Sequence, residues 1–206
     1  MPPRKRIEVD DLSVFLNVPF DVEYAPLFVA LISGLTALGR KPRSVLEIQE
    51  GGQNRLSKIY NLISLCGSSL HDLSRVVLSG ELRVPRFNMP FELGLAVAVA
   101  QKRRHAFFLL EEKPFRIQAS LSDLNGHDPH VHEGTQAGVL RCILDCFATP
   151  SGTPPLATLE RLTTQLSAAA SEFQRELRTD HPFQPHLFRR ITWAASGFAR
   201  LEGLIA

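Results

Sequence analysis

Apolar and polar positions alternate between strand-like and helix-like segments over the first two-thirds of the chain. Short β-rich or apolar runs predict strands over residues 13–19, 44–48, 68–77 and 105–110. Apolar residues spaced three and four positions apart predict helices over residues 24–38, 90–101 and 135–148, with a further helix after the turn at 50–54. This alternation predicts an α/β fold, in which a parallel sheet is wrapped by helices through right-handed crossovers.

The last quarter of the chain has a different pattern. After the Pro-rich and Gly-containing segment 151–155, an apolar stripe over 156–178 predicts a long amphipathic helix, and a second helical segment follows over 187–205. We therefore expect an α/β domain over residues 1–150 and a C-terminal helical hairpin over residues 151–206. The long helix favours packing onto its own domain, and the alternative is that the C-terminal helices form a homo-oligomer or bind a partner.

Composition narrows the function classes. The 206 residues are 44% hydrophobic and 21% charged, which excludes a disordered or fibrous chain. The net charge of +2 argues against a nucleic-acid partner. Three cysteines fit a reducing compartment, no signal peptide is recognisable, and the most apolar stretch, 24–39, is too short for a membrane span. We expect a cytoplasmic protein without a membrane partner.

Polar residues are concentrated where the predicted strands end. In an open parallel sheet, ligands bind beyond the carboxyl ends of the strands. Asparagine, aspartate, arginine, glutamate and paired glycines occur there, in the segments 17–21, 50–55, 71–75 and 86–92. Their convergence predicts a ligand site at this edge of the sheet.

The segment from Arg86 to Gly94 carries the most informative of these residues. If Pro90 is the first helical residue, Glu92 lies in the first turn, near the positive end of the helix dipole. A carboxylate there is expected to stay ionised, which suits a nucleophile or a group that stabilises positive charge. The alternative is that Glu92 only caps the helix. Gly94 and the alanines after it predict a helix that lies close to the sheet.

Four motifs together resemble a bacterial branch of the Toll/interleukin-1-receptor-like (TIR-like) fold. They are Val14-Phe-Leu-Asn-Val-Pro-Phe-Asp21, Gly51-Gly-Gln-Asn-Arg-Leu-Ser-Lys-Ile-Tyr60, His71-Asp-Leu-Ser-Arg75 and Phe87-Asn-Met-Pro-Phe-Glu-Leu-Gly94. The strand-end aspartate and the helical Glu-x-Gly also resemble the nucleoside 2-deoxyribosyltransferases. The resemblance covers about residues 12–148 and implies a flavodoxin-like fold. Many members of these families cleave the N-glycosidic bond of NAD or of a nucleoside, and several bacterial TIR-like proteins act in anti-phage defence.

The resemblance also implies roles for single residues. Glu92 matches the catalytic glutamate that stabilises or captures the ribosyl centre, and Asp72 matches the strand-end aspartate near the sugar. The nucleotide pocket would be lined by residues of two segments: Asn17, Pro19, Phe20, Asp21, Gly51, Gly52 and Arg55.

The chemistry of N-glycoside cleavage extends this assignment. Asp72 would hold ribose hydroxyls, Asn88 would contact the sugar or the leaving base, and Arg55 or Arg86 would neutralise phosphate. The backbone at Gly51 and Gly52 would approach the phosphate closely. Structural alternatives stay open, namely an ordinary turn at these glycines, a solvated Arg55 and a turn-forming Asp72.

The expected function is that of a hydrolase, a TIR-like N-glycosidase that cleaves NAD or a related nucleotide, with the nucleotide as substrate and no cofactor. Two alternatives are a non-catalytic nucleotide-binding sensor or assembly module and a nucleoside 2-deoxyribosyltransferase. Segment 126–133 holds three histidines and two acids, but no second ligand cluster supports a metal, and we expect none. From the loop at 120–132 only Asp123 and His132 are candidates for the pocket edge.

Overall fold

The central sheet has five strands that all run parallel. The computed structural model describes residues 8–47, 54–75, 78–79, 84–85, 87–115, 121, 126–149 and 152–206. In these residues the strand order is β2-β1-β3-β6-β7, with the bounds Lys41–Ser44, Asp10–Asn17, Cys66–Asp72, Ala106–Glu111 and His130–Val131. A separate antiparallel pair joins β4 (Leu78–Ser79) to β5 (Val84–Pro85). When only the five parallel strands are counted along the chain, this order is 2-1-3-4-5, which confirms the expected flavodoxin-like α/β fold.

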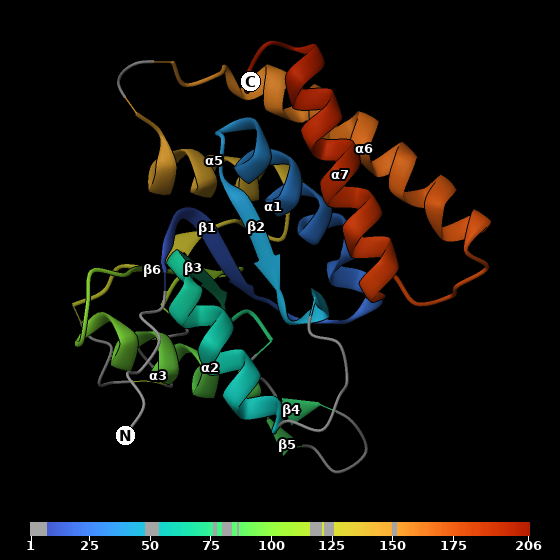
Figure 1. The fold of residues 1–206 in the computed structure, drawn as a ribbon. Coiled ribbons are helices and arrows are strands. Elements are labelled where there is room, and N and C mark those ends of the chain that lie inside the picture. Colours follow the sequence, from blue (N-terminus) through green and yellow to red (C-terminus); the bar gives the residue numbers. More distant parts are fainter. Residues whose placement is uncertain are drawn as a thin grey trace.

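Helices cover both faces of the sheet (Figure 1). On one face lie α2 (Arg55–Leu65) and α3 (Asn88–Ala100), and on the other lie α1 (Ala25–Ala37) and α5 (Gln136–Phe147). Successive side chains of β1 point to opposite faces: Val14 and Leu16 pack with α1, whereas Phe15 packs with α2 and α3. Because of this alternation, neighbouring residues at the end of a strand face opposite sides of the sheet.

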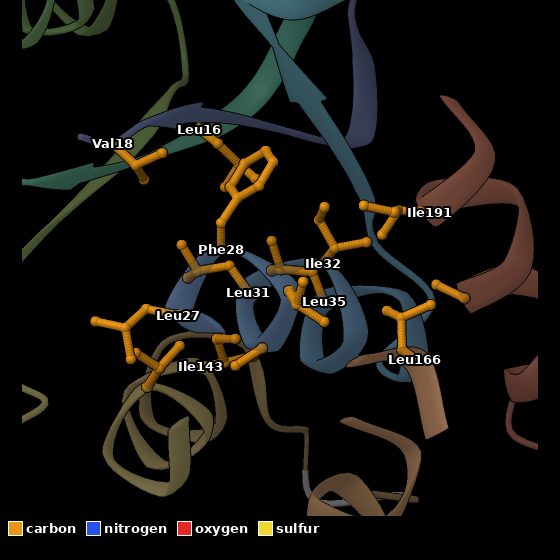
Figure 2. Packing of buried hydrophobic residues seen from close by; sticks show 14 of the residues in the cluster. Leu16, Val18, Leu27, Phe28, Leu31, Ile32, Leu35, Ile143, Leu166 and Ile191 are labelled. Atoms are coloured by element: carbon orange, nitrogen blue, oxygen red, sulfur yellow. The ribbon is translucent and has the colours of Figure 1, made fainter. Parts of the chain in front are cut away.

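The C-terminal segment forms the expected hairpin, α6 (Leu156–Glu176) and α7 (Pro185–Leu201), which packs over α1 (Figure 1). Every residue of α1 from Leu27 to Ala37 is buried, because the sheet covers one side and α5, α6 and α7 cover the others (Figure 2). Leu166 of α6 and Ile191 of α7 belong to the same hydrophobic core as Leu16 of β1. The division of the chain near residue 150 stays a prediction, and the two parts share one core.

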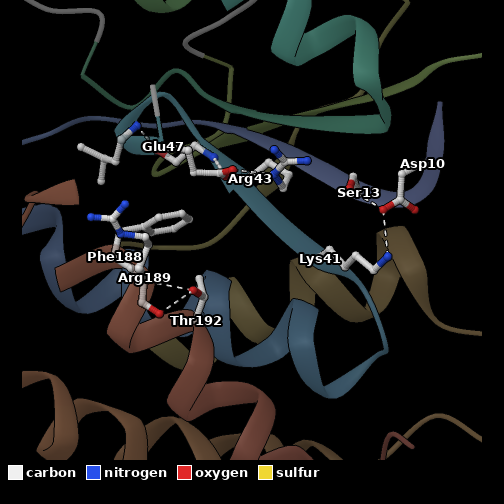
Figure 3. A network of polar contacts seen from close by, with 10 residues as sticks. Asp10, Ser13, Lys41, Arg43, Glu47, Phe188, Arg189 and Thr192 are labelled. Carbon is white, nitrogen blue, oxygen red and sulfur yellow. Dashed lines mark hydrogen bonds and ion pairs between the residues drawn. The ribbon is translucent and has the colours of Figure 1, made fainter. Parts of the chain in front are cut away.

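The second strand lies earlier in the chain than the sequence predicts. A strand was expected over 44–48, but β2 ends at Ser44 and a 3₁₀ turn, η2 (Val45–Glu47), follows. The Glu47 carboxylate folds back to accept hydrogen bonds from the Ser44 backbone N–H (2.9 Å) and from Arg43 Nε (2.8 Å), which turns the chain (Figure 3). At the start of this edge strand, Lys41 Nζ lies 2.9 Å from Asp10 Oδ2 of β1.

Two further boundaries differ from the expectation. β3 ends at Asp72 rather than near residue 77, because Asp72 Oδ1 accepts the Ser74 backbone N–H (2.8 Å) and starts a turn. Helix α3 begins at Asn88, so Pro90 is its third residue, where the missing N–H costs no helical hydrogen bond. Gly94 was expected to face the sheet, but it is exposed, and Ala96 is the small residue that packs inward.

Among the residues that the structure describes, no helix is both long enough and apolar enough to span a membrane.

Candidate functional site

A pocket opens at the carboxyl ends of β1 and β2, beside the first turns of α2 and α3. It encloses about 140 Å³ and is lined by Leu16, Asn17, Val18, Pro19, Phe20, Val45, Arg55, Asn88, Met89 and Glu92. The crossover from β1 to β2 uses α1 on one face and the return from β2 to β3 uses α2 on the other, so β1 is next to the topological switch point. Open α/β sheets bind ligands at such a point.

Two other hollows are larger, and their position and lining distinguish them from this pocket. One of about 320 Å³ lies at the amino ends of the strands, near Asp11, Gly67 and Arg104. The other, of about 210 Å³, lies between α1 and the hairpin and is mainly apolar. Of these three hollows in the described part of the chain, the pocket at the carboxyl ends of the strands combines a carboxyl group with a strongly shifted pKa, an arginine and two asparagines. We therefore take it as the candidate site.

Glu92 is the group in this pocket whose ionisation is most perturbed. Burial raises its pKa from 4.5 to about 7, and the nearby positive charge of Arg55 only partly opposes this shift. Its carboxylate makes no hydrogen bond or ion pair with the residues that the structure describes. Helix capping is therefore not the role of Glu92 in the described structure.

The expectations for Glu92 are corrected in two respects. It lies in the second turn of α3 rather than the first, since the helix begins at Asn88. The carboxyl group was expected to stay ionised, but the raised pKa leaves it close to half protonated at neutral pH. Burial outweighs the helix dipole, whose effect falls off beyond the first turn.

Asn17, at the end of β1, ties the sheet to the start of α3. Its Nδ2 donates to the carbonyl oxygen of Met89 (2.8 Å) and to Nδ1 of His71 (2.9 Å), and the residue is buried. The bond to Met89 joins the strand end to the first turn of α3, and Glu92 follows Met89 by almost one helical turn. Asn17 therefore helps to set the position of the helix that carries Glu92.

Three further pocket residues come from the starts of two helices and from the segment after β1. Arg55 is the first residue of α2 and Asn88 the first of α3, and both side chains are exposed. Phe20 follows β1 and stacks on Phe183 of the α6–α7 loop, with ring centroids 4.8 Å apart. The C-terminal hairpin thus supports one wall of the pocket.

Asp72 does not reach the pocket, which corrects its expected contact with a sugar. It is 0% exposed, and its Oδ2 accepts a hydrogen bond from Tyr24 Oη (2.5 Å) and lies 3.1 Å from His132 Nε2. Burial alone would raise the pKa of Asp72, but the hydrogen bonds from His132, Ser74 and Tyr24 outweigh it and lower the pKa. In β3, His71 faces the pocket side with Phe15, so its neighbour Asp72 faces the α1 side.

The group of Ser74, His132 and Asp72 has the residue types of a catalytic triad but not its geometry. Ser74 Oγ (3.0 Å) and Asp72 Oδ2 (3.1 Å) both approach Nε2 of His132, whereas Nδ1 accepts the Gly134 backbone N–H (3.0 Å). In a triad the serine and the aspartate use different ring nitrogens. These residues, all buried, hold the end of β3 to the turn that precedes α5, so His132 has a structural role.

Comparisons of the chain with models of protein families, with curated proteins and with solved structures find no match. The TIR-like resemblance therefore stays a prediction.

Of the residues predicted for the site, the structure brings six together in the pocket: Asn17, Pro19, Phe20, Arg55, Asn88 and Glu92. Asp21 lies outside it, because its carboxylate accepts the Tyr24 backbone N–H (3.0 Å) and faces Arg75 Nε at 3.6 Å. Gly51, Gly52 and Arg86 lie outside the described residues, as does Asp123 of the loop at 120–132.

Of the apolar lining, sequence reasoning missed Leu16 and Val45, whereas Val18 and Met89 lie within the predicted segments 17–21 and 86–92. Val45 follows β2 directly, so a correct end for that strand would have placed it at the same sheet edge. Met89 lies within the predicted segment 86–92, but only the polar and charged members of that segment were given a contact with the ligand. No group of three or more potential metal ligands occurs in the part of the chain that the structure describes.

Proposed function

We propose that this pocket is the active site of an N-glycosidase that cleaves the bond between ribose and nicotinamide in NAD or a related nucleotide. The observation that carries the proposal is Glu92: a carboxyl group with a pKa of about 7 lines a pocket beyond the strand ends without local hydrogen bonds. Functional sites are where burial and charge shift a carboxyl pKa in this way.

The chemistry needs one carboxylate at the anomeric carbon. When the base leaves, the ribosyl group acquires oxocarbenium character, and an ionised carboxylate stabilises that positive charge or accepts a proton from the attacking water. Nicotinamide leaves NAD as a neutral molecule and needs no proton from an acid. The ionised form of Glu92 is thus the working form, and kcat/KM should rise with pH through about 7.

The pocket has the polarity of a nucleoside site. Its volume of about 140 Å³ is well above the roughly 10–15 Å³ that admits one water molecule, so a sugar or a base can enter it. Asn17 and Asn88 can contact hydroxyl or amide groups, and Phe20 offers an aromatic wall. Arg55 and the first turn of α2 favour a phosphate next to this nucleoside, with the rest of a dinucleotide outside the pocket.

The decisive experiment is to incubate the protein with NAD and to follow nicotinamide release by chromatography. Wild type should release nicotinamide, and Glu92→Gln should lower kcat by at least about a hundredfold, the size of effect expected when a charge-stabilising group is lost. Glu172→Gln, which changes an exposed carboxylate on α6, should keep wild-type turnover. Unchanged turnover in Glu92→Gln would rule out the proposed role of this residue.

The other outcomes separate the alternative functions. Saturable binding of NAD that leaves it intact would favour a nucleotide-binding sensor, and base exchange between two nucleosides would indicate a deoxyribosyltransferase. A role in anti-phage defence, a cytoplasmic location and self-association through α6 and α7 stay predictions. In the last case, Trp193 of α7, which is 78% exposed, is the side chain to replace first.

A further inference from the structure

A chain of buried polar side chains leads from the pocket across β3 to the start of β6. Asn17 Nδ2 lies 2.9 Å from His71 Nδ1, His71 Nε2 lies 2.8 Å from Ser69 Oγ, and Ser69 Oγ lies 2.9 Å from His105 Nε2. The last member, His105, places Nδ1 3.0 Å from the backbone oxygen of Cys66. Asn17, Ser69, His71 and His105 are all buried.

The far end of this chain fixes the direction of every hydrogen bond. His105 Nδ1 lies 3.4 Å from Arg103 Nη2, a donor, but closer, at 3.0 Å, to the Cys66 carbonyl oxygen, which only accepts, so Nδ1 carries the proton and donates to Cys66. Neutral His105 then accepts at Nε2 from the Ser69 hydroxyl, and Ser69 Oγ in turn accepts from His71 Nε2. Burial lowers the pKa of His71 to about 3, with His105 adding to the shift, so His71 is neutral and its Nδ1 can only accept.

This direction determines what Asn17 offers to a ligand. One hydrogen of Nδ2 goes to His71 and the other to the Met89 carbonyl oxygen, so neither is available in the pocket. Oδ1 of Asn17 accepts no hydrogen bond from the described residues. The atom is also not fully buried. Oδ1 is therefore open to the pocket that Asn17 lines.

We propose that His71 is a positioning residue, which locks the Asn17 amide so that the pocket presents only the acceptor Oδ1 and selects ligands that bring a hydroxyl or N–H donor to this point. This inference rests on the proposed function for the nature of the ligand. In NAD the donor is either the 2′-hydroxyl of the ribose next to nicotinamide or the carboxamide NH₂ of nicotinamide. A ligand that places an acceptor there would meet Oδ1 with no hydrogen between the two oxygen or nitrogen atoms. A buried site binds such a ligand much more weakly than one that brings a donor.

The orientation itself is tested without a ligand. In ¹⁵N NMR spectra of wild type, the His71 ring should show an unprotonated Nδ1 and a protonated Nε2 between pH 5 and 8, without titration. Ser69→Ala removes the acceptor of Nε2–H, so the His71 ring should exchange between tautomers. Ser68→Ala is the matched control, because it removes the neighbouring buried hydroxyl, which makes no hydrogen bond in the described structure. A protonated Nδ1 in wild type would overturn the proposal.

The selectivity is tested by steady-state kinetics with NAD and two analogues. One has 2′-deoxyribose next to nicotinamide, and the other, nicotinic acid adenine dinucleotide, replaces the carboxamide by a carboxylate. Wild type should show a KM at least about tenfold higher for whichever analogue lacks the selected donor, the equivalent of one hydrogen bond. Ser69→Ala should raise the KM for NAD about three- to tenfold, change kcat less than twofold and reduce the discrimination between substrates.

Each outcome of the kinetics has one meaning. Equal KM values of wild type for all three compounds, or a Ser69→Ala enzyme that matches Ser68→Ala, would overturn the selection by Asn17. A wild type that neither binds nor cleaves NAD would contradict the proposed function, while the NMR experiment would still decide whether His71 holds the amide.

Discussion

Glu92 is held in a position that its ionised form does not favour. Its side chain is half-buried on α3 without a hydrogen-bond partner among the described residues, and Arg55 compensates only part of the lost hydration. Charged groups in such places lower the stability of the folded state, and active sites commonly accept this cost. The pH dependence of folding should therefore reveal the residue even before a substrate is known.

A raised folded-state pKa makes the Glu92 contribution to stability largest at low pH. Below about pH 4.5 the group is neutral in both states, and between 4.5 and about 7 the folded state holds the proton more tightly. Stability from this group is thus lost as pH rises through 7. Glu92→Gln, which stays neutral, should be more stable than wild type by roughly 1–3 kcal/mol at pH 8 and nearly equal at pH 4.5.

Urea denaturation at the two pH values measures this difference, with Glu172→Gln as the exposed control. A Glu92→Gln variant that is less stable than wild type at pH 8 would contradict the burial of a charged group at this site.

At the residue scale, the sequence predicted those pocket residues whose place follows from where a strand ends or a helix begins. Asn17, Phe20 and Glu92 follow from strand ends and a helix start, which the apolar pattern reveals. Asp72 was assigned wrongly because its place at a strand end and the family resemblance do not show which face of the strand it occupies. The pairing of His71 with Asn17 in neighbouring strands decides that point, and register is a tertiary property. The shifted pKa of Glu92 likewise depends on burial by other elements.

At the scale of elements, the turn between β7 and α5 leaves no room for a side chain at Gly138. Thr135 caps α5 by accepting the Gly138 N–H (2.9 Å) at Oγ1, and this brings the carbonyl oxygen of His132 against the Cα of Gly138. A Cβ at position 138 would collide with that oxygen. The same turn carries His132, which holds Asp72 at the end of β3.

Gly138→Ala should therefore destabilise the protein by roughly 2–4 kcal/mol, because backbone atoms rather than a flexible side chain must move. Gly94→Ala on α3 is the control: its Cβ meets nothing within 4 Å, and alanine should stabilise the helix by roughly 0.5–1 kcal/mol. Thermal denaturation monitored by circular dichroism measures both. A Gly138→Ala protein with wild-type stability would mean that the turn before α5 differs from the structure.

The elements that the sequence predicted best are those with an apolar face long enough to show a period. Helix α5 agrees with the expectation to within one residue at each end, and α1 and β1 to within a few residues. The edge strand β2 was misplaced, because its four residues, Lys41 to Ser44, carry no apolar pattern and its end depends on the carboxylate of Glu47. Edge strands often lack such a pattern, since one face or edge stays in contact with water.

At the scale of the whole molecule, the C-terminal hairpin is joined to the pocket through aromatic rings. Phe183, in the loop between α6 and α7, is buried and stacks on Phe20 at 4.8 Å, and it also contacts Phe28 of α1 at 5.2 Å between centroids. Composition and periodicity predicted the hairpin, but nothing in the sequence showed that its loop would support a pocket wall some 160 positions earlier in the chain.

Phe183→Ala should lower stability by roughly 3 kcal/mol, as large-to-small changes in cores do, and should weaken substrate binding in addition. Phe173→Ala is the comparison, because that ring also belongs to the hairpin but stacks with Arg190 (4.1 Å) away from the pocket. The measurement is KM for NAD at a temperature where both variants are fully folded. Equal KM values for the two variants would show that the stack on Phe183 does not shape the pocket.

The ring contact between Phe20 and Phe183 makes one wall of the candidate site depend on the loop between the last two helices, which lies outside that site. A bound protein, a fused tag or a mutation in the loop can displace Phe183. Each would leave Phe20 unsupported without changing Glu92. An assay that measures only turnover would then attribute the loss to Glu92, whereas the actual change is the lost support of Phe20 by Phe183.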